Sequence, residues 1–244
     1  MPTRRRLGDM TTSTRTLAAF VVTLTVVLGA CGSGQPGSPS PPAVDLPFET
    51  KAVAVALAAD PRFRGFGPLD PNLIGQDRWY EVLPLGDGVR VRLHVGWGDC
   101  PAGCINKHVF DVDVDRSLAV TAVTESGDPI PAGLLPGDVA SEPAVLSVTA
   151  LAGPTCPVER PGDPSCAPRP VAGTIEVIAP NGSGIAAVHT AADGSAELRL
   201  PAGVYVVLGR ADEAFITGDP APVVVSLAGG RLVTVSLFWD TGIR

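Results

Sequence analysis

Few side chains in this sequence could carry out chemistry, and histidine is the first type to consider. The chain has three histidines, His94, His108 and His189, and none lies in an HExxH or comparable metal-site spacing. All three are predicted to be exposed or hydrogen-bonded strand residues. His94 and His108 flank a CxxxC segment and could face each other across a hairpin centred on it. If the chain holds a metal or a small ligand, that pair is the best candidate site.

Cysteine spacing predicts two small disulfide loops. The chain has five cysteines, and setting aside Cys31 near the N-terminus leaves an even number, which allows three pairings. These four are Cys100, Cys104, Cys156 and Cys166. Local pairing, 100–104 and 156–166, is the simplest prediction because each pair lies in one loop. The alternative is a metal site built from the CxxxC segment with His94 or His108, which an oxidising compartment disfavours.

Three alternating aspartates, Asp111, Asp113 and Asp115, resemble the start of a calcium-binding EF-hand loop. The pattern then fails, because its sixth position is Arg116 where glycine is needed and its twelfth is Ala122 where glutamate is needed. Alternate residues of a strand share one face. The prediction is therefore a solvated strand face, with no metal assigned.

No catalytic constellation is found in the sequence. It has no GxSxG nucleophile motif, and no glycine-rich phosphate loop follows a predicted strand. The formal net charge is −7, with no Lys/Arg run beyond the N-terminus, so a nucleic-acid partner is not expected. We therefore predict a protein that is not an enzyme, with no catalytic residues and no cofactor.

The N-terminus has the features of an export signal. Arg4, Arg5 and Arg6 precede an uncharged apolar run over residues 16–30, shorter than the ~20 residues that a spanning helix needs. The run ends in the sequence LGAC, which resembles the bacterial lipobox. That resemblance implies cleavage after residue 30 by signal peptidase II and lipidation of Cys31, giving an extracytoplasmic protein anchored to the cell membrane. An ordinary secretory signal with a chance cysteine is the alternative. A Gly/Ser/Pro-rich tether is predicted over residues 31–46.

Residues 47–125 are predicted to form a small α+β module, one helix on a small antiparallel sheet. A helix is expected over residues 48–60, with strands over 78–83, 89–95, 105–114 and 118–124 and a hairpin turn at 86–88. The string GWGDCPAGC (residues 96–104) is similar to a motif of uncharacterised exported bacterial proteins. Trp97 within it is predicted to pack at a strand turn, with ligand stacking as the alternative. The α-β-β-β order resembles PepSY-like and cystatin-like modules, which implies an inhibitor or regulator of an exported protease.

After a proline-containing linker (residues 126–142), residues 143–244 are predicted to form an all-β sandwich. Seven short strands are separated by turn signals, and no helical stretch occurs among them. They are expected over residues 144–152, 171–179, 184–190, 196–200, 204–209, 223–227 and 232–238.

Residues 192–205, ADGSAELRLPAGVY, resemble the carboxypeptidase regulatory-like, transthyretin-like domains. In that pattern a hairpin turn leads into a strand, a tight corner follows, and a tyrosine (here Tyr205) anchors the next strand. The resemblance covers roughly the last 90–100 residues and implies a prealbumin-like sandwich without catalytic residues.

Together these features predict a non-catalytic, lipid-anchored envelope protein that presents a binding or structural surface. Its expected partners are the membrane, through the lipid, and an unidentified envelope or cell-wall component. Two alternatives stay open: an inhibitor of an exported protease, and capture of a metal or small ligand near Trp97, His94 and His108.

Overall fold

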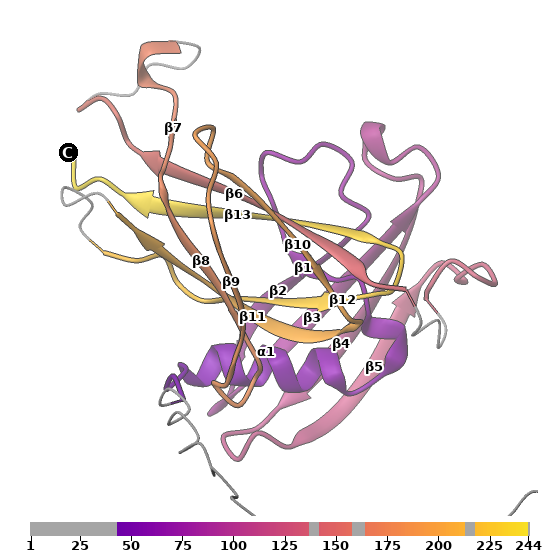
Figure 1. The fold of residues 1–244 in the computed structure, drawn as a ribbon. Coiled ribbons are helices and arrows are strands. Elements are labelled where there is room, and N and C mark those ends of the chain that lie inside the picture. The colour runs from indigo at the N-terminus through magenta and orange to yellow at the C-terminus, as the bar shows by residue number, and fades with distance from the viewer. Residues whose placement is uncertain (1–42, 137–141, 158–163, 213–217, 244) are drawn as a thin grey trace, which may run out of the picture. The chain divides into compact units, whose positions relative to one another are not determined.

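The computed structural model describes residues 43–136, 142–157, 164–212 and 218–243. The predicted signal peptide, Cys31 and the tether up to residue 42 lie outside this part of the chain. The described residues belong to one compact unit, Ser40–Arg244. They form a mostly β structure with three sheets and one α-helix (Figure 1). None of the described helices is long and apolar enough to cross a membrane.

The first sheet is five-stranded, in the order β1-β2-β3-β4-β5. Its strands are β1 (Gly67–Pro68), β2 (Arg78–Leu85), β3 (Gly88–Trp97), β4 (Asn106–Val114) and β5 (Val120–Gly127). All neighbours pair antiparallel except β1 and β2. A two-residue turn joins β2 to β3, and Gly86 there has φ +55°, a conformation that glycine adopts at little cost. Alternate residues of β3 are buried, so this sheet has one core face and one outer face.

Helix α1 (Phe48–Ala58) packs against two sheets. It contacts β3 and β4 of the first sheet and two strands of the sandwich, β11 and β12. Small residues such as Ala52 and Ala56 are fully buried, which lets the helix lie close to both layers. The helix stops before Pro61, where a 3-10 turn (Pro61–Phe63) begins and the Asp60 side chain accepts a hydrogen bond from the Arg62 backbone N–H.

The C-terminal half is a β-sandwich, as the sequence predicts. One sheet has the order β10-β6-β13, with β7 beside β6, and the other has the order β12-β11-β8-β9. The strands are β6 (Ala144–Gly153), β7 (Arg169–Pro170), β8 (Gly173–Ile178), β9 (Gly184–His189), β10 (Ser195–Leu200), β11 (Gly203–Ala211), β12 (Val223–Leu227) and β13 (Leu232–Asp240). Strand β13 pairs with β6 in parallel through nine residue pairs, from Leu232 with Val145 to Asp240 with Gly153.

Trp239 is the largest fully buried side chain of the structure and lies in the core of the sandwich. A Cβ atom at Gly209 would come within 2.5 Å of the Trp239 ring, so glycine at this position leaves the space for the indole. The predicted strand ended one residue before Trp239, whereas β13 continues through Asp240.

The two predicted modules share a core. Ile178, Val206 and Val224, from three strands of the sandwich, are buried in the same hydrophobic cluster as α1 and the first sheet. Two hydrogen bonds also join the two modules. The Tyr80 hydroxyl donates to the Val224 carbonyl at 2.9 Å, and the Ser236 hydroxyl donates to the Asp70 carboxylate at 2.7 Å. Strands β8, β11 and β12 therefore carry buried residues on both faces of their sheet.

The last residues of the predicted tether and the first part of the predicted linker belong to this fold. Leu46, inside the predicted tether, is buried, and the Val44 N–H donates to the Gly182 carbonyl. In the predicted linker, Ile130 and Leu134 pack against the shared core, and the Leu134 carbonyl accepts a hydrogen bond from the Arg78 guanidinium. These contacts hold the start of the linker against both modules.

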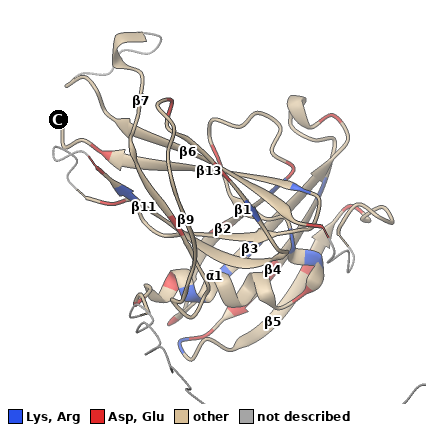
Figure 2. Cartoon of the chain, viewed as in Figure 1, with Lys and Arg blue, Asp and Glu red and all other residues tan. Residues whose placement is uncertain are grey.

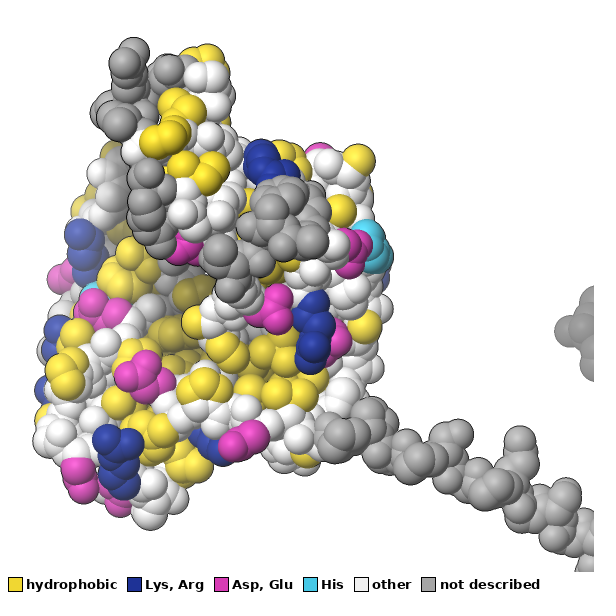
Figure 3. Space-filling model, turned by 90° about the vertical axis from the view of Figure 1, so that its left-hand side faces the viewer, with side chains coloured by type: hydrophobic (Ala, Val, Ile, Leu, Met, Phe, Trp, Pro, Cys, Tyr) yellow, Lys and Arg dark blue, Asp and Glu magenta, His cyan; other side chains and the backbone are white. Residues whose placement is uncertain are grey.

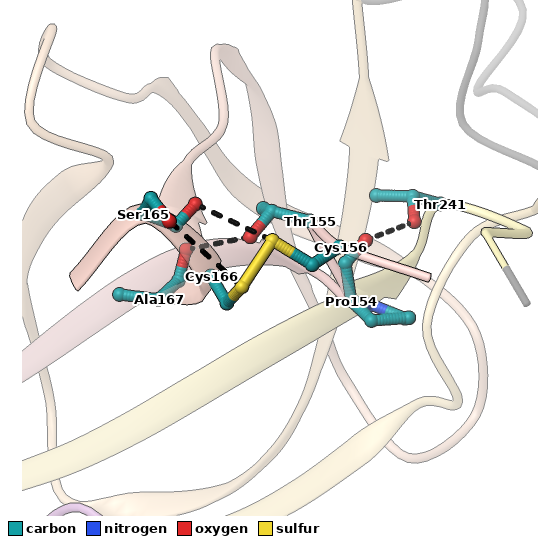
Figure 4. The surroundings of a disulfide bond; sticks show 7 residues. All are labelled: Pro154, Thr155, Cys156, Ser165, Cys166, Ala167 and Thr241. Atoms are coloured by element: carbon teal, nitrogen blue, oxygen red, sulfur yellow. Dashed lines mark hydrogen bonds between the residues drawn. A yellow bond between two sulfur atoms is a disulfide. The ribbon is translucent and has the colours of Figure 1, made fainter. Parts of the chain in front are cut away.

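The local cysteine pairing is confirmed: Cys100 is bonded to Cys104, and Cys156 to Cys166. The second bond lies beyond the end of β6 (Figure 4). Around it the Thr155 hydroxyl donates to the Ala167 carbonyl, and the Thr241 hydroxyl donates to the Pro154 carbonyl (Figure 4). The disulfide loop is thus tied to the chain that follows β13.

Candidate binding site

Paired charges cover the outer face of the first sheet. Arg90 donates two hydrogen bonds to Asp113, at 2.6 and 2.8 Å, across the β3–β4 pair. Arg92 makes the same two-bond contact with Asp111, at 2.8 and 3.1 Å. Basic and acidic positions therefore lie on neighbouring strands (Figure 2). The predicted solvated face exists, but two of its aspartates are held by arginines.

Asp115, the third aspartate of the run, has different partners. Asp115 lies in the turn after β4, where its carboxylate accepts hydrogen bonds from the Ser117 hydroxyl and from backbone N–H groups. These bonds lower the pKa of Asp115, the Ser117 hydroxyl contributing most. Among the described residues no group of three or more histidine, cysteine or acidic side chains is placed to hold a metal ion.

Replacing Asp111 by asparagine is expected to lower the free energy of unfolding by about 1–2 kcal/mol at neutral pH, because the bidentate bond to Arg92 is lost. That bond lowers the pKa of Asp111 in the folded state. The contribution is therefore present above the unfolded value of about 3.9 and is lost as the pH falls through the folded pKa.

The difference between wild type and Asp111→Asn should consequently shrink below about pH 4 in urea titrations followed by circular dichroism. Glu197→Gln, on the exposed side of β10, is the matched control and should leave stability unchanged at both pH values. An equal difference at neutral and acidic pH would contradict the assignment.

His94 and His108 do not face each other. His94 pairs with Val109 in the β3–β4 register and His108 pairs with Val95, so the two side chains leave the sheet on opposite faces. His108 is buried on the core side, where its Nδ1 lies 2.9 Å from the Asp128 carbonyl and its ring lies beside Phe110. The facing histidine pair that the sequence suggested is therefore not formed. The β3–β4 register differs by one residue from the register that would place His94 opposite His108.

A cavity of about 610 Å³ opens beside the CxxxC loop. Two loops form its walls: residues 69–77, which precede β2, and the disulfide loop that includes the 3-10 turn Cys100–Ala102. Its floor is the outer face of the first sheet, including Trp79, His94 and Val109. Of the three ligand candidates predicted from the sequence, His94 and His108 line this cavity and Trp97 does not.

Two aromatic rings form part of that floor. Trp79 and His94 are direct cross-strand neighbours, and their rings stack with centroids 3.7 Å apart and planes 10° apart. His94 Nε2 lies 3.1 Å from a carboxylate oxygen of Glu81, which orients the imidazole. Each ring therefore covers one face of the other, and the pair is held in one orientation beside the cavity.

Buried polar side chains fix the loop of residues 69–77. Asp70 is buried, accepts a hydrogen bond from the Asn72 N–H and is itself reached by the Ser236 hydroxyl. Gln76 accepts from the Asp70 N–H and donates to the carbonyls of Pro68 and Arg78. Because both loop ends are held, this wall of the cavity is positioned by the sandwich as well as by its own sheet.

The disulfide forms the opposite wall. It lies against Gly96, where a Cβ atom would collide with Cys104 Sγ, so the motif needs glycine at this position. Gly103, at φ +109°, closes the tight turn between the two cysteines.

Trp97 and Trp79 lie on opposite faces of the first sheet. Trp97 is half-buried against the shared core on the other face of the sheet, which agrees with its predicted packing role, and it does not line the cavity. Trp79 does line it. A signal was available, because a two-residue turn at Gly86 and Asp87 fixes a register in which residue 79 pairs with residue 94. Lys107 and Gln76 carried no comparable signal.

Charges of both signs are dispersed on the face shown in Figure 3, with exposed hydrophobic side chains between them. On the described part of this face, neither the positive nor the negative side chains form a continuous patch.

Comparison with known proteins gives little further information. No family model matches the chain, and no curated protein matches it. Among solved structures, the Bacillus anthracis TIE protein is similar over 63% of this chain and 25% of its own, with 14% identity and a TM-score of 0.32. GBS52, the minor pilin of Streptococcus agalactiae, is similar over 57% of this chain and 61% of its own, with 13% identity and a TM-score of 0.33. The chain thus spans less than two thirds of either protein.

Proposed function

We propose that this chain is a non-catalytic, lipid-anchored envelope protein that presents a binding surface on one two-module body. The observation that carries the proposal is the pair of disulfides on a chain whose N-terminus resembles a lipoprotein signal. Structural disulfides are typical of oxidising, extracytoplasmic compartments. The anchor would be Cys31, and the partner an envelope or cell-wall component.

The finer proposal is that residues 143–244 form a carboxypeptidase regulatory-like domain. In its support, the quoted segment contains β10 and β11, which are joined by a tight corner and lie in opposite sheets of the sandwich. The hairpin expected at the preceding turn is not formed, because β9 and β10 also lie in different sheets. Asp193 caps the turn at its start by accepting from the Ser195 N–H and hydroxyl. The Tyr205 hydroxyl donates to the Pro201 carbonyl at 3.0 Å, closing the corner between the two strands. Such domains support or bind and do not turn over substrate.

Cys31→Ser is expected to abolish lipid attachment and to move the protein from the membrane fraction to the soluble extracytoplasmic fraction. The measurement is metabolic labelling with an alkyne fatty acid, followed by fractionation and intact-mass analysis. Ser33→Ala, two residues along the same tether, is the matched control and should keep both label and membrane association. An unlabelled wild type, or an unlabelled Cys31→Ser variant that stays in the membrane fraction, would reject the anchor.

A further inference from the structure

We propose that the cavity beside the Cys100–Cys104 disulfide binds a small amphiphilic anion, a flat apolar ring system that carries one acidic group. The ring system would pack against the Trp79–His94 pair, and the acidic group would lie at the Lys107 ammonium. This inference rests on the proposed function as a binding protein and deepens it by naming the chemistry of the ligand.

The size and position of the cavity fit a small molecule. Its volume of about 610 Å³ lies within the ~300–1,000 Å³ range of small-molecule sites. Its walls are held by a disulfide on one side and by the bonded Asp70 and Gln76 side chains on the other. A preformed site of this kind binds without a large ordering cost.

The lining is suited to an apolar ring. Leu69 and Leu73 are 54% and 41% exposed and line the same cavity as the stacked Trp79 and His94. Large apolar side chains held in solvent around a hollow are typical of ligand sites. An aromatic or fused-ring ligand would cover these leucines and pack against the Trp79–His94 pair.

The charges favour an anion. Lys107 lines the cavity, and among the described residues no side chain accepts a hydrogen bond or ion pair from its ammonium group. The one lining carboxylate that could compete, Asp77, lies 3.9 Å from the Arg78 guanidinium, which partly compensates its charge. His94 is engaged by Glu81. Of the described residues that line the cavity, Lys107 therefore carries the positive charge that an anionic ligand can reach.

Binding of two fluorescent probes by the full mature chain, residues 31–244 carrying Cys31→Ser to avoid detergent, tests the inference. The probes are the anion 8-anilinonaphthalene-1-sulfonate and its uncharged relative N-phenyl-1-naphthylamine. We expect one site per chain for both, with the anion bound more tightly. Lys107→Gln should weaken binding of the anion about tenfold and leave the uncharged probe unaffected.

Matched variants locate the site. Lys51→Gln changes the other lysine of the chain, on α1, and should alter neither affinity. Leu73→Glu, on an exposed loop, should weaken anion binding more than binding of the uncharged probe. Val109→Trp should fill the cavity and abolish both. Unfolding curves confirm that each variant is folded, and Leu73→Glu keeps the test decisive if Val109→Trp does not fold.

Equal anion affinity in the wild type and Lys107→Gln would overturn the inference, as would binding at several sites per chain or tighter binding of the cationic dye thioflavin T. Because these measurements use unlipidated protein, their failure leaves the Cys31 labelling result intact, and a failed labelling experiment leaves the probe result intact.

Discussion

Replacing Trp239 by alanine is expected to lower the free energy of unfolding by about 3–5 kcal/mol, enough to remove much of the stability of a typical domain. The indole is fully buried between the two sheets of the sandwich, and Gly209 leaves no side chain that could move into the vacated space. The cavity would therefore persist. The measurement is guanidinium unfolding followed by far-ultraviolet circular dichroism, which does not depend on the removed fluorophore.

Two control variants separate the effect of lost buried volume on stability from the effect of a lost hydrogen bond. Phe238→Ala, one residue earlier and 50% exposed, should cost less than about 1 kcal/mol. Trp239→Phe should cost much less than alanine, because the phenyl ring fills part of the space and, among the described residues, the indole N–H has no hydrogen-bond partner to lose. A loss below about 1 kcal/mol for Trp239→Ala would show that the sandwich core is not packed around this ring.

The sandwich alone, residues 143–244, is expected not to fold as a soluble monomer. In the full chain Ile178, Val206 and Val224 are buried against α1 and the first sheet. Cutting the chain would expose this apolar face to water, and such a patch promotes aggregation. Size-exclusion chromatography and circular dichroism of the fragment provide the measurement.

A rescue experiment makes this prediction specific. Changing the same three residues to threonine should increase the soluble, folded fraction of the fragment, because threonine keeps the branched shape and adds a hydroxyl that water can satisfy. In the full chain the same triple change should destabilise by several kcal/mol, since the hydroxyl groups would then lie in the shared core. A fragment that is soluble and folded without the changes would show that the two modules are independent.

Most elements of the fold could be predicted because the sequence patterns are local. The helix from Phe48 and the hairpin at Gly86 follow from spacing and turn residues, and the structure places both there. The two-residue strands β1 and β7 carry no pattern long enough to recognise. The parallel pairing of β6 with β13 joins residues 87 positions apart, and periodicity says nothing about partners at that distance.

The shared core did leave a signal in the sequence. Neighbouring valines such as Val206 and Val207, or Val224 and Val225, break the alternation of apolar and polar residues expected of a strand with one solvent-exposed face. Consecutive buried apolar residues mean that both faces are covered. The candidate site was harder to predict, because it depends on which face each side chain takes. A shift of one residue in the β3–β4 register decides whether His94 faces His108, and the separate β2–β3 register places His94 beside Trp79.

The direction of β13 determines how the molecule would respond to mechanical load. Because β13 runs parallel to β6, tension on the C-terminal end along the strand would slide one strand past the other. The evenly spaced hydrogen bonds between them would then be strained together, and not opened one after another as in a peeled hairpin. Rupture under shear would require most of this ladder to fail at once, so the C-terminal strand is the part of the sandwich best placed to resist extension.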